Sequence, residues 1–313
     1  MYAKYTYSAG STVANILNDV VLILTGTTNK ATLSANCDQA NTEILTTYNV
    51  AGWTLHDGNA GTNKKVISAP NSDVGTKYAI LDTGSNAGYL KITVSEDWNS
   101  TTHIATNEVY NTYPNNPVIS TTVSGSLYIY ASPRTLVMMS FQSGTFGCGN
   151  YSGWEAVVER ERGIAYWDTI GNNYPLSILL DPAQGLCANG IGVNVKSPRV
   201  KNILNGADGT MYGYIDTVFK GVFGSSFNNA MTSSKVLNSQ DQLSLLVTRM
   251  YVGSLGELVW AGDISTKNDL PLLQPNQGNC LDELEYGGKT RVLFSNSATT
   301  SSCSYGSILV PKG

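Results

Sequence analysis

From Trp53 onward the chain consists of short segments rich in β-branched and aromatic residues, separated by turns of Gly and Asn. The first four segments are GWTLHD, KKVISAP, KYAILDTG and GYLKITVSEDW, and the turns between them are GNAGTN, NSDVG and GSNAG. β-Branched and aromatic residues favour strands, and Gly/Asn turns favour tight connections between antiparallel strands. This pattern predicts an antiparallel sheet.

Composition and helical periodicity complete the expected fold. The chain has 31 Gly and 18 Tyr but only 13% charged residues, so the Lys, Glu and Arg that usually cover helical surfaces are scarce. Apolar residues at helical spacing predict one helix over 11–24, with Ser11 or Thr12 as N-cap and Gly26 just past its end. A weaker period predicts a second, shorter helix or a pair of helical turns within 33–48. We therefore expect an α+β, β-rich fold whose N-terminal helices pack on a small antiparallel sheet.

The length of 313 residues favours two domains. A Pro/Asn-rich passage predicts a linker at 113–126, between an N-terminal α+β domain at 1–112 and a larger β-rich, loop-rich domain at 127–313. In the second domain, the strand-like runs SLYIYASPRTLVMMSFQ and GWEAVVERER flank a predicted Gly-rich turn, SGTFGCGNYSG. We expect a hairpin around residues 143 to 153.

Charge and targeting signals limit the partners. The net charge is −4 and the 19 basic residues are dispersed, so neither nucleic acid nor an anionic membrane is an expected partner. The N-terminus lacks the pattern of a secretory signal, and the longest apolar run, VVLIL, is too short to span a membrane. We therefore expect synthesis in a cytoplasm, with protein or carbohydrate partners.

The five Cys are odd in number, widely spaced and without a C-x-x-C motif. This favours buried free thiols over a disulfide framework. A Cys148–Cys187 or Cys280–Cys303 bridge stays open as an alternative, because spacing does not establish connectivity.

The segment AILDTGSN, residues 79 to 86, resembles the active-site signature of the pepsin-like and retroviral aspartic proteases. Their chemistry requires two Asp that share one proton. The other Asp-Thr sequences, WDTIG and YIDTVF, lack the Gly that the signature needs. We predict that Asp82, Gly84 and Ser85 form a turn between two strands.

Other catalytic signatures are missing from the sequence. The two His, His56 and His103, have no Cys or carboxylate beside them at a metal-ligand spacing, and we expect surface or structural roles for both. No G-x-S-x-G, Walker-type or G-x-G-x-x-G motif marks acyl or phosphoryl transfer. Nothing selects a carboxylate pair for glycoside hydrolysis. We expect no catalytic residue, no metal and no cofactor.

The segment GWEAVVERERG concentrates charge in a chain with little of it. Arg134, in the preceding strand-like run, is the natural cross-strand partner of an acid there. We predict that Arg134 pairs with Glu159 or Glu161, or that these residues meet a neighbouring subunit. Arg160 and Arg162 belong to the same structural or interfacial cluster.

The two runs around the Gly-rich gap, together with the N-terminal segments YSAG, ILNDVVLILTGTTNKATLSANCDQANTEI and AGWTLHD, resemble the virion structural proteins encoded among the head and tail genes of tailed bacteriophages. The resemblance covers about the first 170 residues. It implies a non-enzymatic tail or baseplate component, assembled in the bacterial cytoplasm and bound to other virion proteins and to copies of itself. A head decoration protein, a host-surface-binding adhesin and a protein or glycan hydrolase stay as alternatives.

Overall fold

The fold is β-rich, and the sheets are built from antiparallel pairs, as the sequence predicts. The computed structural model describes residues 1–69, 76–84, 88–95, 97–106, 109–110, 117–133, 135–143, 145–156, 173–181, 185–186, 212–217, 245–246, 248–254, 257–263, 272–273, 279–295 and 307–313.

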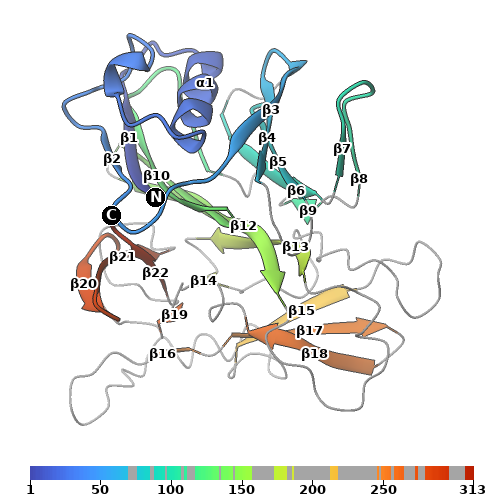
Figure 1. Cartoon of the computed structure of the whole chain (residues 1–313). Coiled ribbons are helices and arrows are strands. Elements are labelled where there is room, and N and C mark those ends of the chain that lie inside the picture. The colour runs from blue at the N-terminus through green and yellow to red at the C-terminus, as the bar shows by residue number, and fades with distance from the viewer. Residues whose placement is uncertain are drawn as a thin grey trace.

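The largest element is a seven-stranded sheet at the centre of the described part of the molecule (Figure 1). Its strands, from one edge to the other, are β14 (Gly185–Leu186), β13 (Asn173–Asp181), β12 (Thr145–Ala156), β11 (Thr135–Gln142), β10 (Gly125–Ser132), β1 (Tyr2–Tyr7) and β2 (Glu43–Leu45). The N-terminal strand β1 thus lies inside the sheet, between β10 and β2.

One face of this sheet is covered by α1 (Val13–Leu24) and a five-stranded sheet. That sheet contains β3 (Thr54–Gly61), β4 (Lys64–Ala69), β5 (Lys77–Asp82), β6 (Lys91–Ser95) and β9 (Val109–Tyr110). Side chains alternate between the two faces of a strand. Leu127 and Ile129 of β10 therefore join Ile16 and Leu17 of α1 and Ile92 of β6 in one buried core.

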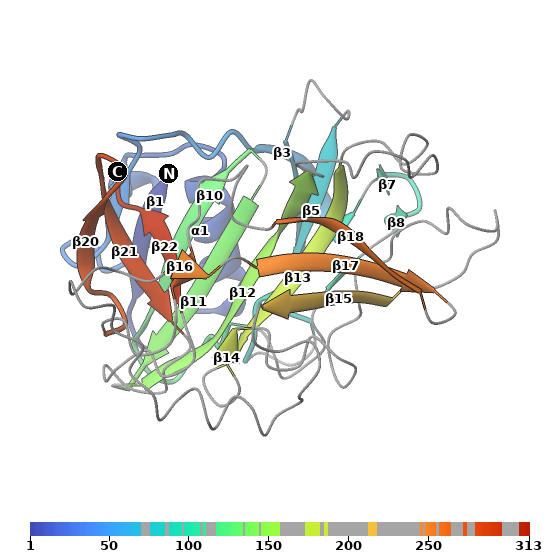
Figure 2. The same cartoon turned by 90° about the horizontal axis from the view of Figure 1, so that it is seen from below.

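The other face of the seven-stranded sheet meets a second five-stranded sheet, seen beside β10 and β11 in Figure 2. Its strands are β16 (Leu245–Leu246), β19 (Leu272–Leu273), β22 (Ser307–Pro311), β21 (Lys289–Ser295) and β20 (Glu283–Tyr286). The ring of Phe294 lies 6.2 Å from that of Tyr2 and 6.4 Å from that of Tyr128. Because β10 is covered on both faces, seven of its eight residues are buried, which explains its almost continuous apolar sequence.

Two smaller sheets complete the strand inventory of the described residues. The first is three-stranded, with β15 (Tyr212–Thr217), β17 (Thr248–Ser254) and β18 (Glu257–Asp263). The second is the hairpin of β7 (Asp97–Asn99) and β8 (Ile104–Thr106).

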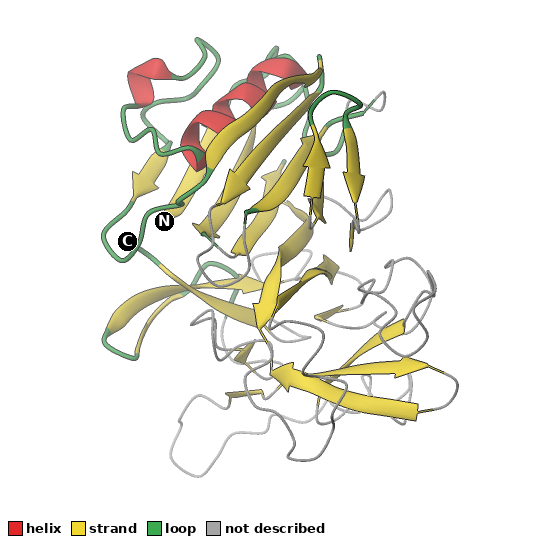
Figure 3. Cartoon of the chain, turned by 45° about the vertical axis from the view of Figure 1, so that its right-hand side comes forward, coloured by secondary structure: helices red, strands yellow, loops and turns green. Residues whose placement is uncertain are grey.

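The predicted helix over 11–24 is confirmed as α1, and Thr12 is its N-cap. The Thr12 Oγ1 accepts a hydrogen bond of 3.0 Å from Asn15 N, and Gly26 follows the helix with a φ of 104°. Among the residues that the structure describes, helix occurs only in this corner (Figure 3), where the other helical element is the 3-10 turn η1 (Lys30–Thr32). Within the described part of the chain, no helix has the length and apolar character needed to cross a membrane.

The option of a second helix within 33–48 is wrong, and the segment has turns at 35–36 and 39–41 instead. A single α-helix therefore replaces the expected N-terminal helices. The segment also holds a bridge between Cys37 and Tyr7 and the short strand β2. Asp38 Oδ1 accepts a hydrogen bond of 3.1 Å from Asn41 N, which closes a local turn. Asp, Asn and Ser side chains compete in this way for the backbone groups that a helix would use.

The predicted Gly-rich turn at 143 to 153 is also shorter than expected. Gln142 pairs with Thr145, and β12 runs through the glycines to Ala156. Glycine weakens an isolated strand, but β12 lies between β11 and β13, so its backbone is hydrogen-bonded along both edges.

The described part of the predicted linker packs against the sheet. Ile119 is buried, and Ser120 N donates a hydrogen bond of 3.1 Å to the Tyr7 hydroxyl. The seven-stranded sheet takes strands from both sides of the 113–126 segment. The division into two domains stays a prediction.

Candidate functional site

The predicted charge cluster lies outside the described residues, and its pairing stays a prediction. β11 begins at Thr135, immediately after Arg134, and β12 ends at Ala156. The residues concerned are Arg134, Glu159, Arg160, Glu161 and Arg162.

Asp82 closes a turn, as predicted. It is the last residue of β5, and its Oδ1 accepts a hydrogen bond of 2.7 Å from the N–H of Gly84, whose φ is 57°. Its Oδ2 lies 3.7 Å from Lys64 Nζ on the neighbouring strand. Ser85 lies outside the described residues. The contacts of Asp82 are thus those of a turn residue with a partly exposed ion pair.

We expect Asp82→Asn to lower the free energy of unfolding by less than about 1 kcal/mol, because Asn keeps the side-chain oxygen that accepts from Gly84 and loses only a partly exposed ion pair. Urea unfolding followed by tryptophan fluorescence measures this. A pepstatin-sensitive peptidase activity at acid pH that disappears in Asp82→Asn would contradict the structural role.

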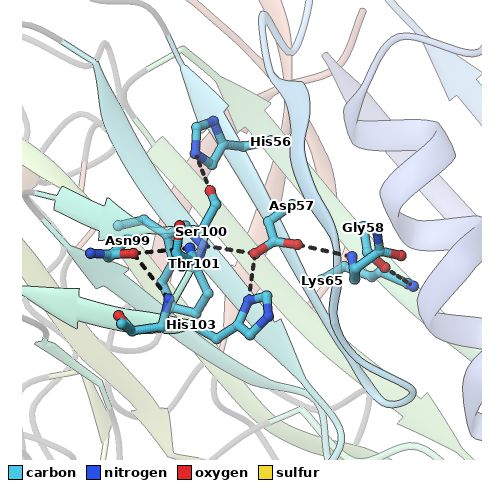
Figure 4. Close-up of polar contacts among 11 residues, drawn as sticks. His56, Asp57, Gly58, Lys65, Asn99, Ser100, Thr101 and His103 are labelled. Atoms are coloured by element: carbon cyan, nitrogen blue, oxygen red, sulfur yellow. Dashed lines mark hydrogen bonds and ion pairs between the residues drawn. The ribbon is translucent and has the colours of Figure 1, made fainter.

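A polar cluster joins β3 to the β7–β8 hairpin (Figure 4). Asp57 lies at its centre and is only 6% exposed. Its Oδ2 accepts hydrogen bonds from Trp98 Nε1 at 3.0 Å and from His103 Nδ1 at 2.8 Å, and its Oδ1 accepts one from Asn59 N at 2.9 Å. One carboxylate therefore fixes β7, through Trp98, and the hairpin turn, through His103, to β3.

Local backbone geometry makes these contacts possible. The β3–β4 register shifts between Leu55 and Asp57, and such a bulge redirects the side chains beside it. At the hairpin tip, Asn99 Oδ1 accepts hydrogen bonds from Thr101 N at 2.9 Å and Thr102 N at 3.0 Å. These bonds hold the turn that brings His103, with a φ of 55°, under Asp57.

Apolar packing holds the hairpin against the sheet as well. Trp98 is 6% exposed and lies in a small cluster with Val66 and Ile80, on the outer side of the β4–β5 pair. Tyr78 and Ala105 pack against the edge of this cluster. The Asp57 bonds thus complete a contact that apolar burial already favours.

The surroundings of Asp57 shift the pKa of its carboxyl in two opposite directions. Burial by itself raises the pKa of the Asp57 carboxyl. The hydrogen bonds donated by Trp98, Asn59 and His103, with the charge of the His103 imidazole, outweigh burial and hold this pKa below its usual range. An ionised carboxylate only accepts hydrogen bonds, so the Nδ1 of His103 carries the proton in this pair.

The cluster contains a second contact, but the two contacts do not form a catalytic triad. Ser100 Oγ lies 3.1 Å from His56 Nε2, and the His56 ring packs edge-on against Tyr78 at 4.8 Å. In a Ser-His-Asp triad, one imidazole bridges the hydroxyl and the carboxylate. Here Ser100 contacts one His and Asp57 contacts the other. Both contacts join segments distant in sequence, and both His are exposed.

We expect Asp57→Ala to lower the free energy of unfolding by about 1–2 kcal/mol at pH 7, because it leaves the buried Trp98 Nε1 without its acceptor. The folded pKa of Asp57 lies below the unfolded value of about 3.9, so the carboxylate stabilises the fold above that pH. This contribution is lost as the pH falls further, through the folded pKa.

Urea-unfolding midpoints measured from pH 7 to pH 3 test this prediction. The gap between wild type and Asp57→Ala shrinks below about pH 4. Asp97→Ala is the matched control, since Asp97 is an exposed acid of the same hairpin whose carboxylate accepts from the adjacent Trp98 N. A gap that is constant with pH would show that the carboxylate charge contributes nothing.

Sequence reasoning considered both His but missed Asp57. Its partners Trp98 and His103 lie 41 and 46 residues away. No spacing rule connects residues so distant; the only local signal is a charged residue inside the strand-like segment GWTLHD.

The cysteines agree in part with expectation. Cys37 is a buried free thiol, and Cys280 is buried too. The Cys280 Sγ lies 3.8 Å from Met139 Sδ, and the alternative of a Cys280–Cys303 bridge stays open. The side chains of Cys148, Cys187 and Cys303 lie outside the described residues.

Among the residues that the structure describes, no group of three or more His, Cys, Asp or Glu side chains is placed to hold a metal ion. No protein-family model matches the chain, and no curated protein matches its sequence.

Proposed function

We propose that this chain is a structural, non-enzymatic component of a tailed bacteriophage particle, a tail or baseplate subunit that contacts other virion proteins and copies of itself. The sequence resemblance of the first 170 or so residues supports this class of protein. The sparse charge supports it too, because protein–protein interfaces are depleted in Lys and Glu.

The main support for the proposal is that the buried acids Asp19 and Asp57 hold separate segments of the fold together. Asp19 and Asp57 are 1% and 6% exposed, and both accept hydrogen bonds from segments distant in sequence. Both carboxylates therefore act as braces between elements of the framework. A fold stabilised in this way suits a subunit that must keep its structure within a large assembly.

Quantitative mass spectrometry of purified particles, from the host strain that carries the gene, tests the proposal. We expect the chain in several copies per particle, in a number set by the symmetry of the tail or baseplate. A copy number that follows the head lattice would identify a head decoration protein instead. Release of the chain with isolated fibres that bind host cells would identify an adhesin, and absence from the particle would refute the proposal.

A further inference from the structure

The strands β20, β21 and β22 cover part of one face of the seven-stranded sheet (Figure 2). We call residues 279–295 and 307–313, which contain these strands, the cover. Its fully buried Phe294 packs with Tyr2 of β1 and Tyr128 of β10. Among the described residues, no strand of the cover pairs with a strand of the seven-stranded sheet. Separation of the two therefore breaks side-chain packing but no ladder of backbone hydrogen bonds.

A buried arginine holds the cover together from within. Arg291 lies on β21 and is 1% exposed. Its Nε donates a hydrogen bond of 3.0 Å to Tyr286 O of β20, and its Nη1 donates one of 3.5 Å to Leu309 O of β22. One planar guanidinium thus joins all three strands. The sheet continues from β22 to β19 and β16, and these strands stay with the cover.

Lys312, directly after β22, ties the cover to the N-terminal part of the chain. Its Nζ lies 2.6 Å from Glu283 Oε1 of the cover and 3.8 Å from Glu43 Oε2 of β2. The hydrogen bond with Glu283 raises the pKa of Lys312, so the ammonium keeps its charge. Nearby, Thr290 N donates a hydrogen bond of 3.3 Å to the Tyr48 hydroxyl. The Glu283 and Glu43 side chains are 51% and 41% exposed, so dissolved salt screens the contact with Lys312.

We propose that the cover opens from the seven-stranded sheet as one unit while the rest of the fold stays closed, and that Lys312 is the latch that opposes this opening. Local units of this kind open at a lower free energy than the whole fold. Opening exposes Phe294, Tyr2 and Tyr128 to water, which keeps the closed state dominant. The open state thus presents an aromatic face that the closed chain buries.

Hydrogen–deuterium exchange of the folded full chain, followed by mass spectrometry of peptic peptides, tests the proposal. Amides of β21 and β22 exchange together and before those of α1 and β10, because β10 stays paired with β1 and β11 when the cover is open. Lys312→Gln removes the charge of the latch, and we expect exchange in β21 and β22 to become about threefold faster, as for a partly exposed ion pair. Exchange in α1 stays as in wild type.

Salt separates the charge of Lys312 from its packing. At an ionic strength of about 1 M the Debye length is only about 3 Å, so the difference between wild type and Lys312→Gln shrinks. Lys64→Gln is the matched control, because Lys64 also forms a partly exposed ion pair, at 3.7 Å from Asp82, but lies on β4. It leaves exchange in β21 and β22 unchanged.

Phe294→Leu is the second variant, because it removes the ring contacts with Tyr2 and Tyr128. We expect exchange in β21 and β22 to become about tenfold faster in this variant, and thermal unfolding shows whether each variant is folded. Wild-type exchange of β21 and β22 at the same opening free energy as α1 would overturn the proposal. Equal effects of Lys312→Gln and Lys64→Gln, or a difference that salt leaves unchanged, would overturn the role of Lys312 as the latch.

Discussion

Replacing Asp19 with alanine lowers the free energy of unfolding by about 2–4 kcal/mol. Asp19 lies on α1 and is 1% exposed. Its carboxylate accepts hydrogen bonds from the Tyr5 hydroxyl at 2.7 Å, from Ser34 N at 2.8 Å and from Ser34 Oγ at 2.7 Å. Alanine leaves these donors without an acceptor, and the buried Tyr5 hydroxyl has no access to water in exchange. Urea unfolding followed by fluorescence measures the loss.

Three further variants separate the contributions to this cluster. Asp19→Asn keeps one side-chain oxygen as acceptor, so we expect a smaller loss than with alanine. Tyr5→Phe removes one donor and leaves the two bonds from Ser34. Asp38→Ala is the control, since that carboxylate bonds Asn41 within its own turn. Similar losses for Asp19→Ala and Asp38→Ala would show that the buried cluster does not brace the fold.

Replacing Gly125 with alanine lowers the free energy of unfolding by about 2–3 kcal/mol. Gly125 pairs with Tyr7 across β10 and β1. An added Cβ would lie 2.6 Å from the Tyr7 hydroxyl oxygen, 2.8 Å from its Cζ and 2.9 Å from Gln142 Cγ. The Tyr7 ring is fully buried, so it has little room to move away. Gly58→Ala is the control, because its nearest neighbour, Leu55 Cδ2, would lie at an ordinary 3.5 Å.

A double-mutant cycle with Tyr7→Phe tests the cause of this loss. Phenylalanine lacks the oxygen atom nearest to the new Cβ, so Gly125→Ala costs at least about 0.5 kcal/mol less in the Tyr7→Phe background. Additive losses would mean that the clash with Tyr7 is not the source of the destabilisation.

The features predictable from sequence are those set by neighbours along the chain. The helix of Val13–Leu24 carries its own apolar period and its Thr12 cap, and both act within a few residues. The strands from Thr54 to Ser95 carry β-branched residues and their own turn residues, and the turn at Asp82 closes on Gly84, two residues on. Hydrogen bonds between residues this close in sequence depend little on the rest of the fold.

The remaining features depend on contacts between distant segments. The segment after residue 33 forms no helix because Ser34 and Thr42 bond to Asp19 and Thr6, which lie elsewhere in the chain. The Gly-rich segment after Thr145 becomes a strand because strands pair with it on both sides. Tertiary context of this kind outweighs local propensity.

The sequence by itself determined the β-rich class, the helix, the first strands and the turn at Asp82. Only the tertiary structure decided that β1 lies inside the central sheet, that β10 of this sheet is buried on both faces, and that Asp57 fastens the hairpin. The physical reason is that a buried carboxylate has no water to bond, so it stabilises the fold only when other segments donate hydrogen bonds to it. The hairpin donors to Asp57, Trp98 and His103, lie 41 and 46 residues from it in sequence. Local sequence patterns extend over only a few residues, so they do not predict a contact between residues this far apart.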